Sequence, residues 1–321
     1  MFERTALAEG PRVISARIPG SRSVSIAAYV LAGSRLEAPD QAGVAHFMEH
    51  ITFKGTSAFP TTRAISEAIE GVGGSFNAAT DRESTVYWVR VPARQARRAA
   101  DVVAELIVRP RLEDAEIDHE RSVIVEEIRS YLDDPSEYAQ ILIQQAMFGD
   151  GALGREICGD EEGIRTLPRS TIREFWAATY RPSNVVVAIA GDLDHAAALD
   201  LIAPAFGTGN GVSPEFDGSP DLPAGPQYLL GNRDTSQAHL CLAVPAFKRD
   251  HPDSWAVGVL NGVLGEGMSS RLFLAVREEL GLAYDVGSGI TEYADVGSLG
   301  VYAGVDPDKL EPALEAILAE L

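Results

Sequence analysis

The chain has little cysteine, no long apolar run and no excess of basic residues. Its 321 residues include only two cysteines, Cys158 and Cys241, which form neither a CxxC pair nor a zinc-knuckle spacing. Two lone thiols are typical of a reducing cytoplasm, and buried packing is their expected role. No stretch approaches the roughly 18 apolar residues of a membrane span, and the charged N-terminus lacks an apolar export region. We therefore expect a cytoplasmic protein that does not enter the membrane.

The charge balance argues against nucleic acid as a partner. The formal net charge is -20 at pH 7, which is the wrong sign for neutralising phosphates. A well-solvated acidic surface is the simpler explanation. The G-x-S-x-G elbow of serine hydrolases is missing from the sequence, and residues 265–273, GEGMSSRLF, lack the G-K-[ST] ending of a phosphate loop. Neither nucleophilic serine chemistry nor nucleotide binding is expected.

A repeat organises what is present. Residues 207–226 contain five Gly and four Pro, a composition that predicts a linker. On both sides of it the order strand, helix, helix, strand, strand, helix occurs. In the first copy these elements are expected at 23–33, 41–55, 61–74, 75–80, 84–92 and 93–108. In the second copy they are expected at 237–247, 253–267, 269–281, 283–291, 297–305 and 306–321.

Runs of strands and runs of helices predict an α+β fold. We expect two homologous domains, each an antiparallel sheet with helices packed on one face. The N-terminal domain, residues 1–206, continues for about 100 residues beyond its repeat, through three more helices, a strand and a last helix. The second domain, residues 227–321, lacks that C-terminal half. Its sheet edge is expected to be open, so a homodimer or a partner chain is a candidate to complete it.

The mostly apolar segment AGVAHFMEHITFKGT, residues 42–56, carries His46, Glu49 and His50. On a helix, positions i and i+4 lie about 40° apart, so both imidazoles can point at one ion. Glu49 is offset by about 60° from His46, near enough to reach a water on that ion. The H-x-x-E-H order is the inverzincin motif. An ordinary pair of histidines is the alternative, and the equivalent helix of the second copy has none.

Two histidines do not complete a catalytic zinc site, which usually has three protein ligands and one water. The helix predicted over 113–134 carries Glu120 and Glu127, which face the same way within about 20°, beside its inward apolar stripe. Burying two carboxylates is costly unless they meet a metal or a cation. They could instead reach water or pair with Arg121 or Arg129. Helix geometry favours neither glutamate over the other as the third ligand.

At these residues the chain resembles the pitrilysin/insulinase family of zinc peptidases, most closely the bacterial relatives of the mitochondrial processing peptidase β-subunit. In that family a ligand glutamate follows H-x-x-E-H after 76 residues, and Glu127 stands at this interval after His50. The resemblance implies that His46, His50 and Glu127 bind Zn²⁺. It also makes Glu120 the supporting glutamate of the catalytic site.

The resemblance also implies substrate-binding residues. The family's GGxxNAxT strand pairs with substrate backbone, and here GGSFNAAT places Asn77 and Ala78 in that role. The second family domain supplies an arginine and a tyrosine seven residues apart, and REELGLAY gives Arg277 and Tyr284. Without the resemblance, these two would be an exposed helix arginine and a strand tyrosine at a domain edge.

The implied function is that of a zinc metalloendopeptidase acting on extended peptides or small unfolded polypeptides. Zinc would activate a water, and Glu49 would act as the general base. The alternative is a non-proteolytic or partner-dependent subunit of the same family that binds peptides or assembles a complex. Such relatives usually lose motif residues, whereas all four motif residues are present here.

Overall fold

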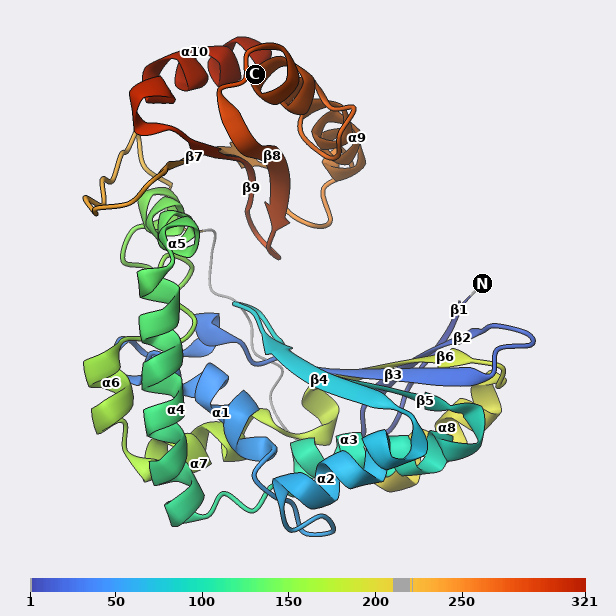
Figure 1. The fold of residues 1–321 in the computed structure, drawn as a ribbon. Helices are drawn as coiled ribbons and strands as arrows, with labels where there is room; N and C mark the ends of the chain where they lie inside the picture. The colour runs from blue at the N-terminus through green and yellow to red at the C-terminus, as the bar shows by residue number, and fades with distance from the viewer. Residues whose placement is uncertain (1, 210–219, 221) are drawn as a thin grey trace. The chain divides into compact units, whose positions relative to one another are not determined.

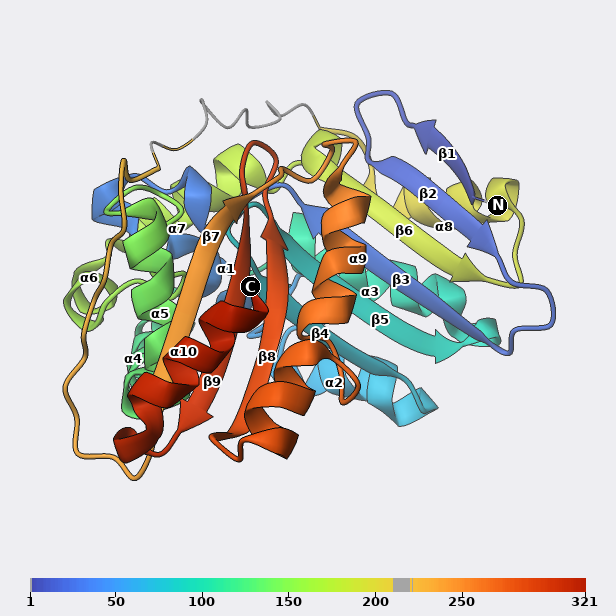
Figure 2. The same ribbon diagram turned by 90° about the horizontal axis from the view of Figure 1, so that it is seen from above.

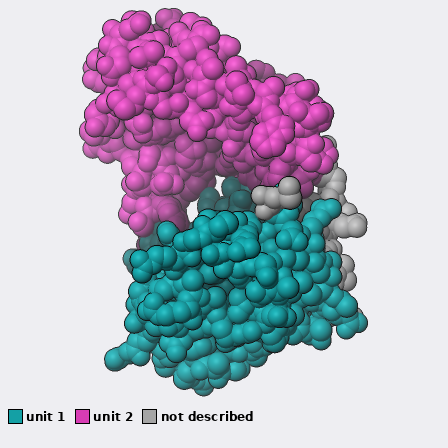
Figure 3. Space-filling model, turned by 90° about the vertical axis from the view of Figure 1, so that its right-hand side faces the viewer, with its two compact units in different colours: residues 1–128, 156–215 teal, residues 129–155, 216–321 magenta. Residues whose placement is uncertain are grey.

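A computed structural model describes residues 2–209, 220 and 222–321. They divide into two compact units, coloured separately in Figure 3: unit 1 comprises 1–128 and 156–215, and unit 2 comprises 129–155 and 216–321. Most of the predicted linker, 210–219 and 221, lies outside the described residues. The units differ from the predicted continuous domains because residues 129–155 group with unit 2.

Unit 1 is built on a six-stranded sheet with the order β1-β2-β6-β3-β5-β4 (Figure 1). Its strands are β1 (Phe2–Ala6), β2 (Arg12–Arg17), β3 (Ser23–Val30), β4 (Ser75–Thr80), β5 (Thr85–Pro92) and β6 (Val185–Gly191). The pattern does not reveal β1 and β2: β1 has the charged pair Glu3 and Arg4, and β2 has adjacent apolar residues, Val13 and Ile14, in place of alternation. The prediction of a purely antiparallel sheet is wrong, since β2 and β6 pair in parallel. Strand β6 inserts between β2 and β3, which run in opposite directions, so it must be parallel to one of them.

Helices cover one face of this sheet. The helices of the first repeat and the last helix of unit 1 are α1 (Val44–Thr52), α2 (Thr62–Ile69), α3 (Ala96–Val108) and α8 (His195–Phe206). Helix α3 packs on β3 and β5, α8 packs on β2, and α1 contacts β4 and β5. Alternate residues of β3 and β6 are buried, among them Ile26, Val187 and Ile189. This period of two is what a sheet with one covered face requires.

Four helices, rather than the three predicted, connect α3 to β6. They are α4 (Asp114–Asp133), α5 (Pro135–Phe148), α6 (Glu161–Thr166) and α7 (Arg169–Thr179). Helix α4 is the one that carries Glu120 and Glu127. Helix α5 belongs to unit 2, where it packs against that unit's first strand, and this contact explains why residues 129–155 group there.

Unit 2 repeats the first part of unit 1. Its elements are β7 (Ala238–Ala246), α9 (Ser254–Leu264), the π-helix η6 (Phe273–Glu279), β8 (Ala283–Glu292), β9 (Gly297–Val305) and α10 (Leu310–Glu320). The antiparallel order β7-β9-β8 reproduces β3-β5-β4 of unit 1. Within the described part of the chain, no strand pairs with the edge of β7 where β6 pairs with β3. The predicted α+β class and the repeated order of elements are confirmed.

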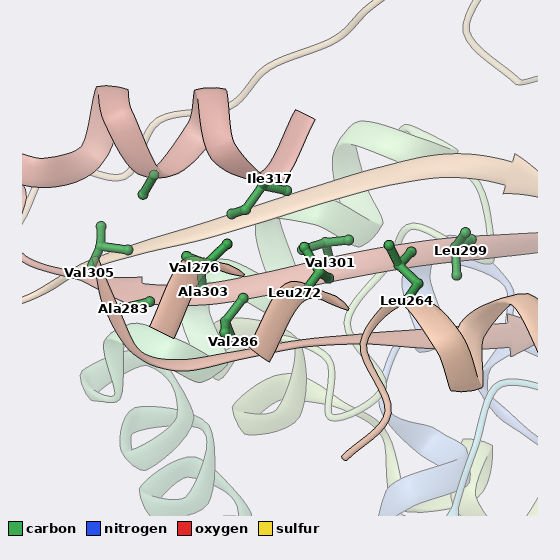
Figure 4. Close-up of a cluster of buried hydrophobic side chains, with 11 residues drawn as sticks. Leu264, Leu272, Val276, Ala283, Val286, Leu299, Val301, Ala303, Val305 and Ile317 are labelled. Carbon is green, nitrogen blue, oxygen red and sulfur yellow. The ribbon is translucent and has the colours of Figure 1, made fainter. Parts of the chain in front are cut away.

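The core of unit 2 lies between its sheet and its helices. Figure 2 shows α10 over β7 and β9 and α9 alongside β8, which α9 contacts. The buried side chains, shown in Figure 4, are Leu264, Leu272, Val276, Ala283, Val286, Leu299, Val301, Ala303, Val305, Ala313 and Ile317. They come from both helices, from η6 and the residue before it, from β8 and from alternate positions of β9, so this unit has a hydrophobic core of its own.

Short 3₁₀ helices complete the described structure. They are η1 (Ser34–Leu36), η2 (Pro39–Gln41), η3 (Glu70–Val72), η4 (Ala93–Gln95), η5 (Pro182–Asn184) and η7 (Pro307–Lys309). The turn at η1 and η2 leads directly into α1 and so helps to fix where that helix begins.

Candidate metal centre

The start of helix α1 is fixed by a buried carboxylate. Glu37, which is 5% exposed, accepts hydrogen bonds from the backbone N–H groups of Gly43 (2.9 Å) and Ala45 (2.7 Å). A negative charge at a helix N-terminus pairs with its free N–H groups and with the helix dipole. Gly43 has a φ of 91°, which favours glycine. Glu37 therefore fixes the backbone of the first turn of α1 up to Ala45, the residue before His46.

Helix α1 buries one face and presents another. Ala45, Phe47, Met48 and Ile51 are at most 1% exposed and form part of the unit 1 core. His46 and His50 lie one turn apart, with ring centroids separated by 4.5 Å. Their spacing thus places two imidazoles side by side on a helix that is anchored by its apolar face.

Glu127 of α4 reaches both histidines. Its Oε1 lies 3.7 Å from Nε2 of His46, and its Oε2 lies 3.2 Å from Nε2 of His50. The three side chains come from two helices of unit 1, and both Nε2 atoms lie near the Glu127 carboxylate. The structure therefore brings together the three residues that the family resemblance implies as metal ligands.

Glu120 lies on the other side of the His50 ring. It accepts a hydrogen bond from Nδ1 of His50 at 2.9 Å, and its second oxygen lies 2.6 Å from Nζ of Lys54. Burial alone would raise the pKa of Glu120, but the contacts with His50 and Lys54 outweigh it and lower the pKa. Lys54 was not among the residues predicted for the site, although its position one turn after His50 could have suggested it. A carboxylate on Nδ1 fixes the orientation of a histidine whose Nε2 binds a metal.

The two histidines have opposite pKa shifts. Burial, and next the neighbouring His50, lower the pKa of His46 to about 4, so this ring is neutral near pH 7. Burial alone would lower the pKa of His50, but its hydrogen bonds with Glu120 and Glu127 raise it to about 9. Two carboxylates thus make the position between His50 and Glu127 favourable for a cation, while His46 offers a free lone pair.

Glu49 is the remaining residue of the H-x-x-E-H motif. Its Oε2 accepts a 2.6 Å hydrogen bond from the hydroxyl of Thr80, the last residue of β4. Burial raises the pKa of Glu49 above its ordinary value, and the hydrogen bond from Thr80 opposes this shift. Thr80 is a second partner that the sequence did not indicate. It holds the carboxylate beside the histidines without making it a member of the donor group.

The donor distances fit a zinc ion. Zinc lies about 2.1 Å from nitrogen or oxygen and about 2.3 Å from sulfur. Two nitrogen or oxygen donors of one ion are therefore at most about 4.2 Å apart, and a nitrogen and a sulfur donor at most about 4.4 Å. The distances of 3.7 Å and 3.2 Å from Glu127 to the two Nε2 atoms fall within the limit for nitrogen and oxygen donors. Two imidazoles and one carboxylate are also a donor set typical of catalytic zinc.

The predicted substrate-binding residues lie in both units. Asn77 and Ala78 belong to β4, which is the last strand of the unit 1 sheet. The N–H of Ala78 donates to Oδ1 of Asn77 (2.9 Å). In unit 2, the guanidinium carbon of Arg277 lies 4.8 Å from the ring centroid of Tyr284, which is 75% exposed. The structure thus brings Arg277 and Tyr284 together, as a cation–π pair.

Comparisons with known proteins agree with this fold. The family model described as insulinase (peptidase family M16) matches residues 12–161, and that described as peptidase M16 inactive domain matches residues 166–321. A protein of Mycobacterium leprae named "uncharacterized zinc protease" is 37% identical over 318 residues, which cover 98% of this chain and 71% of the relative. A protein of Bacillus subtilis with the same description is 35% identical over 323 residues, covering 99% and 77%.

Solved structures share the fold at lower identity. A protease from Helicobacter pylori gives a TM-score of 0.92 at 22% identity, covering 99% of this chain and 78% of that one. A peptidase M16 inactive domain from Pseudomonas fluorescens gives 0.89 at 23% identity, covering 100% and 78%. In the described part of the chain, no helix has both the length and the apolarity needed to cross a membrane.

The sequence order of the site residues defines the inverzincin class of motif. The chain belongs to peptidase family M16, the insulinase family. The predicted membership of the pitrilysin/insulinase family is therefore confirmed. A particular closeness to the mitochondrial processing peptidase β-subunit stays a prediction.

Proposed function

We propose that this protein is a zinc endopeptidase that hydrolyses extended peptides or small unfolded polypeptides. The observation that carries the proposal is the convergence of His46, His50 and Glu127 beside the buried carboxylate of Glu49. The name "zinc protease" given to the relatives in M. leprae and B. subtilis supports it. His46, His50 and Glu127 would hold the zinc.

Different residues of the site have different roles in the proposed hydrolysis. Bound zinc supplies a Lewis acid that acidifies a water and polarises a carbonyl. Glu49 accepts the proton of the attacking water and passes it to the leaving amine, for which a raised pKa is suitable. Thr80 orients Glu49, and Glu120 orients His50. Glu49 and His50 are thus each positioned by a hydrogen bond with a second residue, donated by Thr80 in the first case and accepted by Glu120 in the second.

Strand β4 offers a place for the peptide. It ends the sheet order of unit 1, and the Ala78 N–H donates to the Asn77 side chain rather than to a strand. A peptide that added to this edge would gain backbone hydrogen bonds with little demand on its sequence. Arg277 and Tyr284 of unit 2 are proposed separately as substrate-binding residues that would donate hydrogen bonds to peptide carbonyls.

A non-proteolytic, partner-dependent subunit is the second candidate. It is favoured by the match of residues 166–321 to a family model described as an inactive domain. The β7 edge, which no described strand covers, would accept a partner chain or a second copy. We propose a cytoplasmic location for either candidate, which the free thiols of Cys158 and Cys241 support.

Metal removal separates the two functions. We expect the purified chain to contain one zinc ion and to cleave a quenched fluorescent peptide. A chelator should abolish cleavage, and added Zn²⁺ should restore it, because the chemistry needs the Lewis acid. Metal content is measured by elemental analysis and cleavage by fluorescence. One bound zinc without cleavage would favour the subunit, and cleavage that survives complete removal of metal would rule out the zinc mechanism.

Lys54 should matter for metal binding although it is not a ligand. Replacing Lys54 with methionine removes the ammonium that lies 2.6 Å from the 2%-exposed Glu120. We expect zinc affinity, measured by chelator competition, to fall about tenfold, the scale found when a supporting partner is lost. Lys54→Arg should keep most of the affinity because the charge remains. Lys248→Met, in an ion pair with Asp250 in unit 2, is the control that should change nothing.

A further inference from the structure

Cys158 lies beside the candidate metal centre. The sequence does not indicate this proximity, because Cys158 is far from the H-x-x-E-H motif along the chain. Its Sγ lies 3.9 Å from Nε2 of His46, 112 residues earlier in the sequence. One donor atom each from His46, Glu127 and Cys158 lies within 4.8 Å of the other two. The cysteine was expected only to pack in a core. It is indeed buried, but a ring nitrogen and a carboxylate are its neighbours.

Two close backbone approaches hold Cys158 in this position. A Cβ at Gly43 would lie 2.6 Å from the carbonyl oxygen of Cys158, and a Cβ at Gly159 would lie 2.5 Å from that of Ala42. Both glycines have positive φ, 91° and 72°. The chain at 158–159 therefore presses against the residues just before α1. Cys158 is fixed next to the helix that carries His46.

The surroundings of His46 point to a metal. The residue is 7% exposed, and its Nδ1 is a buried atom without a hydrogen-bond partner. Its Nε2 faces only longer contacts, 3.7 Å to Glu127 and 3.9 Å to Cys158. A buried imidazole normally has a hydrogen-bond partner. A cation between Nε2, the carboxylate and the sulfur would give this nitrogen a closer partner than either of these contacts provides.

We propose that Cys158 is a fourth protein donor to the metal, so that His46, His50, Glu127 and Cys158 together bind a thiophilic divalent cation such as Zn²⁺. The proposal rests on the zinc centre of the proposed function. The distance from Sγ to Nε2 lies below the limit of about 4.4 Å for a nitrogen and a sulfur donor of one zinc ion. Coordination replaces the S–H bond by a sulfur–metal bond and releases one proton to solvent.

A fourth protein ligand changes the character of the site. Four protein donors are typical of closed zinc sites, whereas catalytic sites keep one position for water. Cys158 would therefore fill the position that a catalytic zinc site keeps for water, and peptide cleavage would require that position to be open. A thiolate also favours zinc over magnesium, calcium and manganese, which prefer oxygen ligands.

Cobalt substitution tests the inference without measuring activity. Metal-free protein is loaded with Co²⁺, the bound metal is counted by elemental analysis, and the near-ultraviolet sulfur-to-cobalt charge-transfer absorption is recorded. The wild-type protein and the Cys241→Ala control should both show this band, because Cys241 lies in unit 2. Cys158→Ala and Cys158→Ser should bind cobalt without the band. The zinc affinity of these two variants should be reduced by no more than about tenfold relative to the control.

The outcomes separate this inference from the proposed function. One cobalt per chain without a sulfur band would overturn the role of Cys158 and leave the zinc centre intact. Failure of the wild-type protein to bind cobalt or zinc would overturn both. Thiol alkylation gives a second measurement that needs no variant. Adding zinc to the metal-free protein should slow the modification of Cys158 and leave that of Cys241 unchanged, as followed by peptide mass spectrometry. An equal effect of zinc on both thiols would contradict coordination.

Discussion

Replacing Glu49 with glutamine should abolish most peptide cleavage and leave zinc binding unchanged. The amide has nearly the same shape and can still accept the hydrogen bond from Thr80, but it cannot take a proton from water. We expect kcat to fall between about a hundredfold and ten-thousandfold, the usual contribution of general acid–base catalysis. The measurements are cleavage of a quenched peptide and metal content by elemental analysis.

This variant should fold normally. Burial raises the pKa of Glu49, so the folded protein disfavours its charged form, and a neutral amide removes that cost. Thermal unfolding of Glu49→Gln should therefore occur at or above the wild-type temperature. Glu67→Gln, at a largely exposed position of α2, is the matched control for activity. Normal cleavage by Glu49→Gln would show that another group moves the proton.

Replacing Glu127 with glutamine should cause the largest loss of zinc. Its carboxylate is the group that approaches both Nε2 atoms, at 3.7 Å and 3.2 Å. An amide at this position has no negative charge to offset that of the ion. We expect the zinc affinity to fall by more than the roughly tenfold to hundredfold typical of a lost supporting residue. Chelator competition followed by elemental analysis measures this loss.

Glu126→Gln is the matched control for this experiment. It changes the same residue type one position earlier on α4, where the side chain is exposed. On a helix, neighbouring positions point about 100° apart, so Glu126 cannot share the direction of Glu127. Its zinc content should equal that of the wild-type protein. Equal losses in the two variants would contradict the assignment of Glu127 as a ligand.

The fold was largely predictable because its signals are local. Alternation in β3 and β6 and helical spacing in α1 and α4 depend on residues a few positions apart. The repeated order of elements followed from these periods. The parallel pairing of β2 with β6 did not, because it joins segments more than 170 residues apart and depends on where β6 inserts. Likewise, the packing of α5 on β7 could not be predicted, because no short sequence pattern indicates that contact.

The candidate site divides in the same way. The sequence by itself determined that His46, Glu49 and His50 share one helix and that Glu120 and Glu127 share a face of another, since helical geometry fixes both spacings. Only the tertiary structure decided that Glu127 faces the Nε2 atoms while Glu120 takes Nδ1 of His50. It also placed Lys54 on Glu120 and Cys158 beside His46. These contacts depend on how two helices and a distant loop pack together, and packing is a property of the whole unit rather than of any short segment.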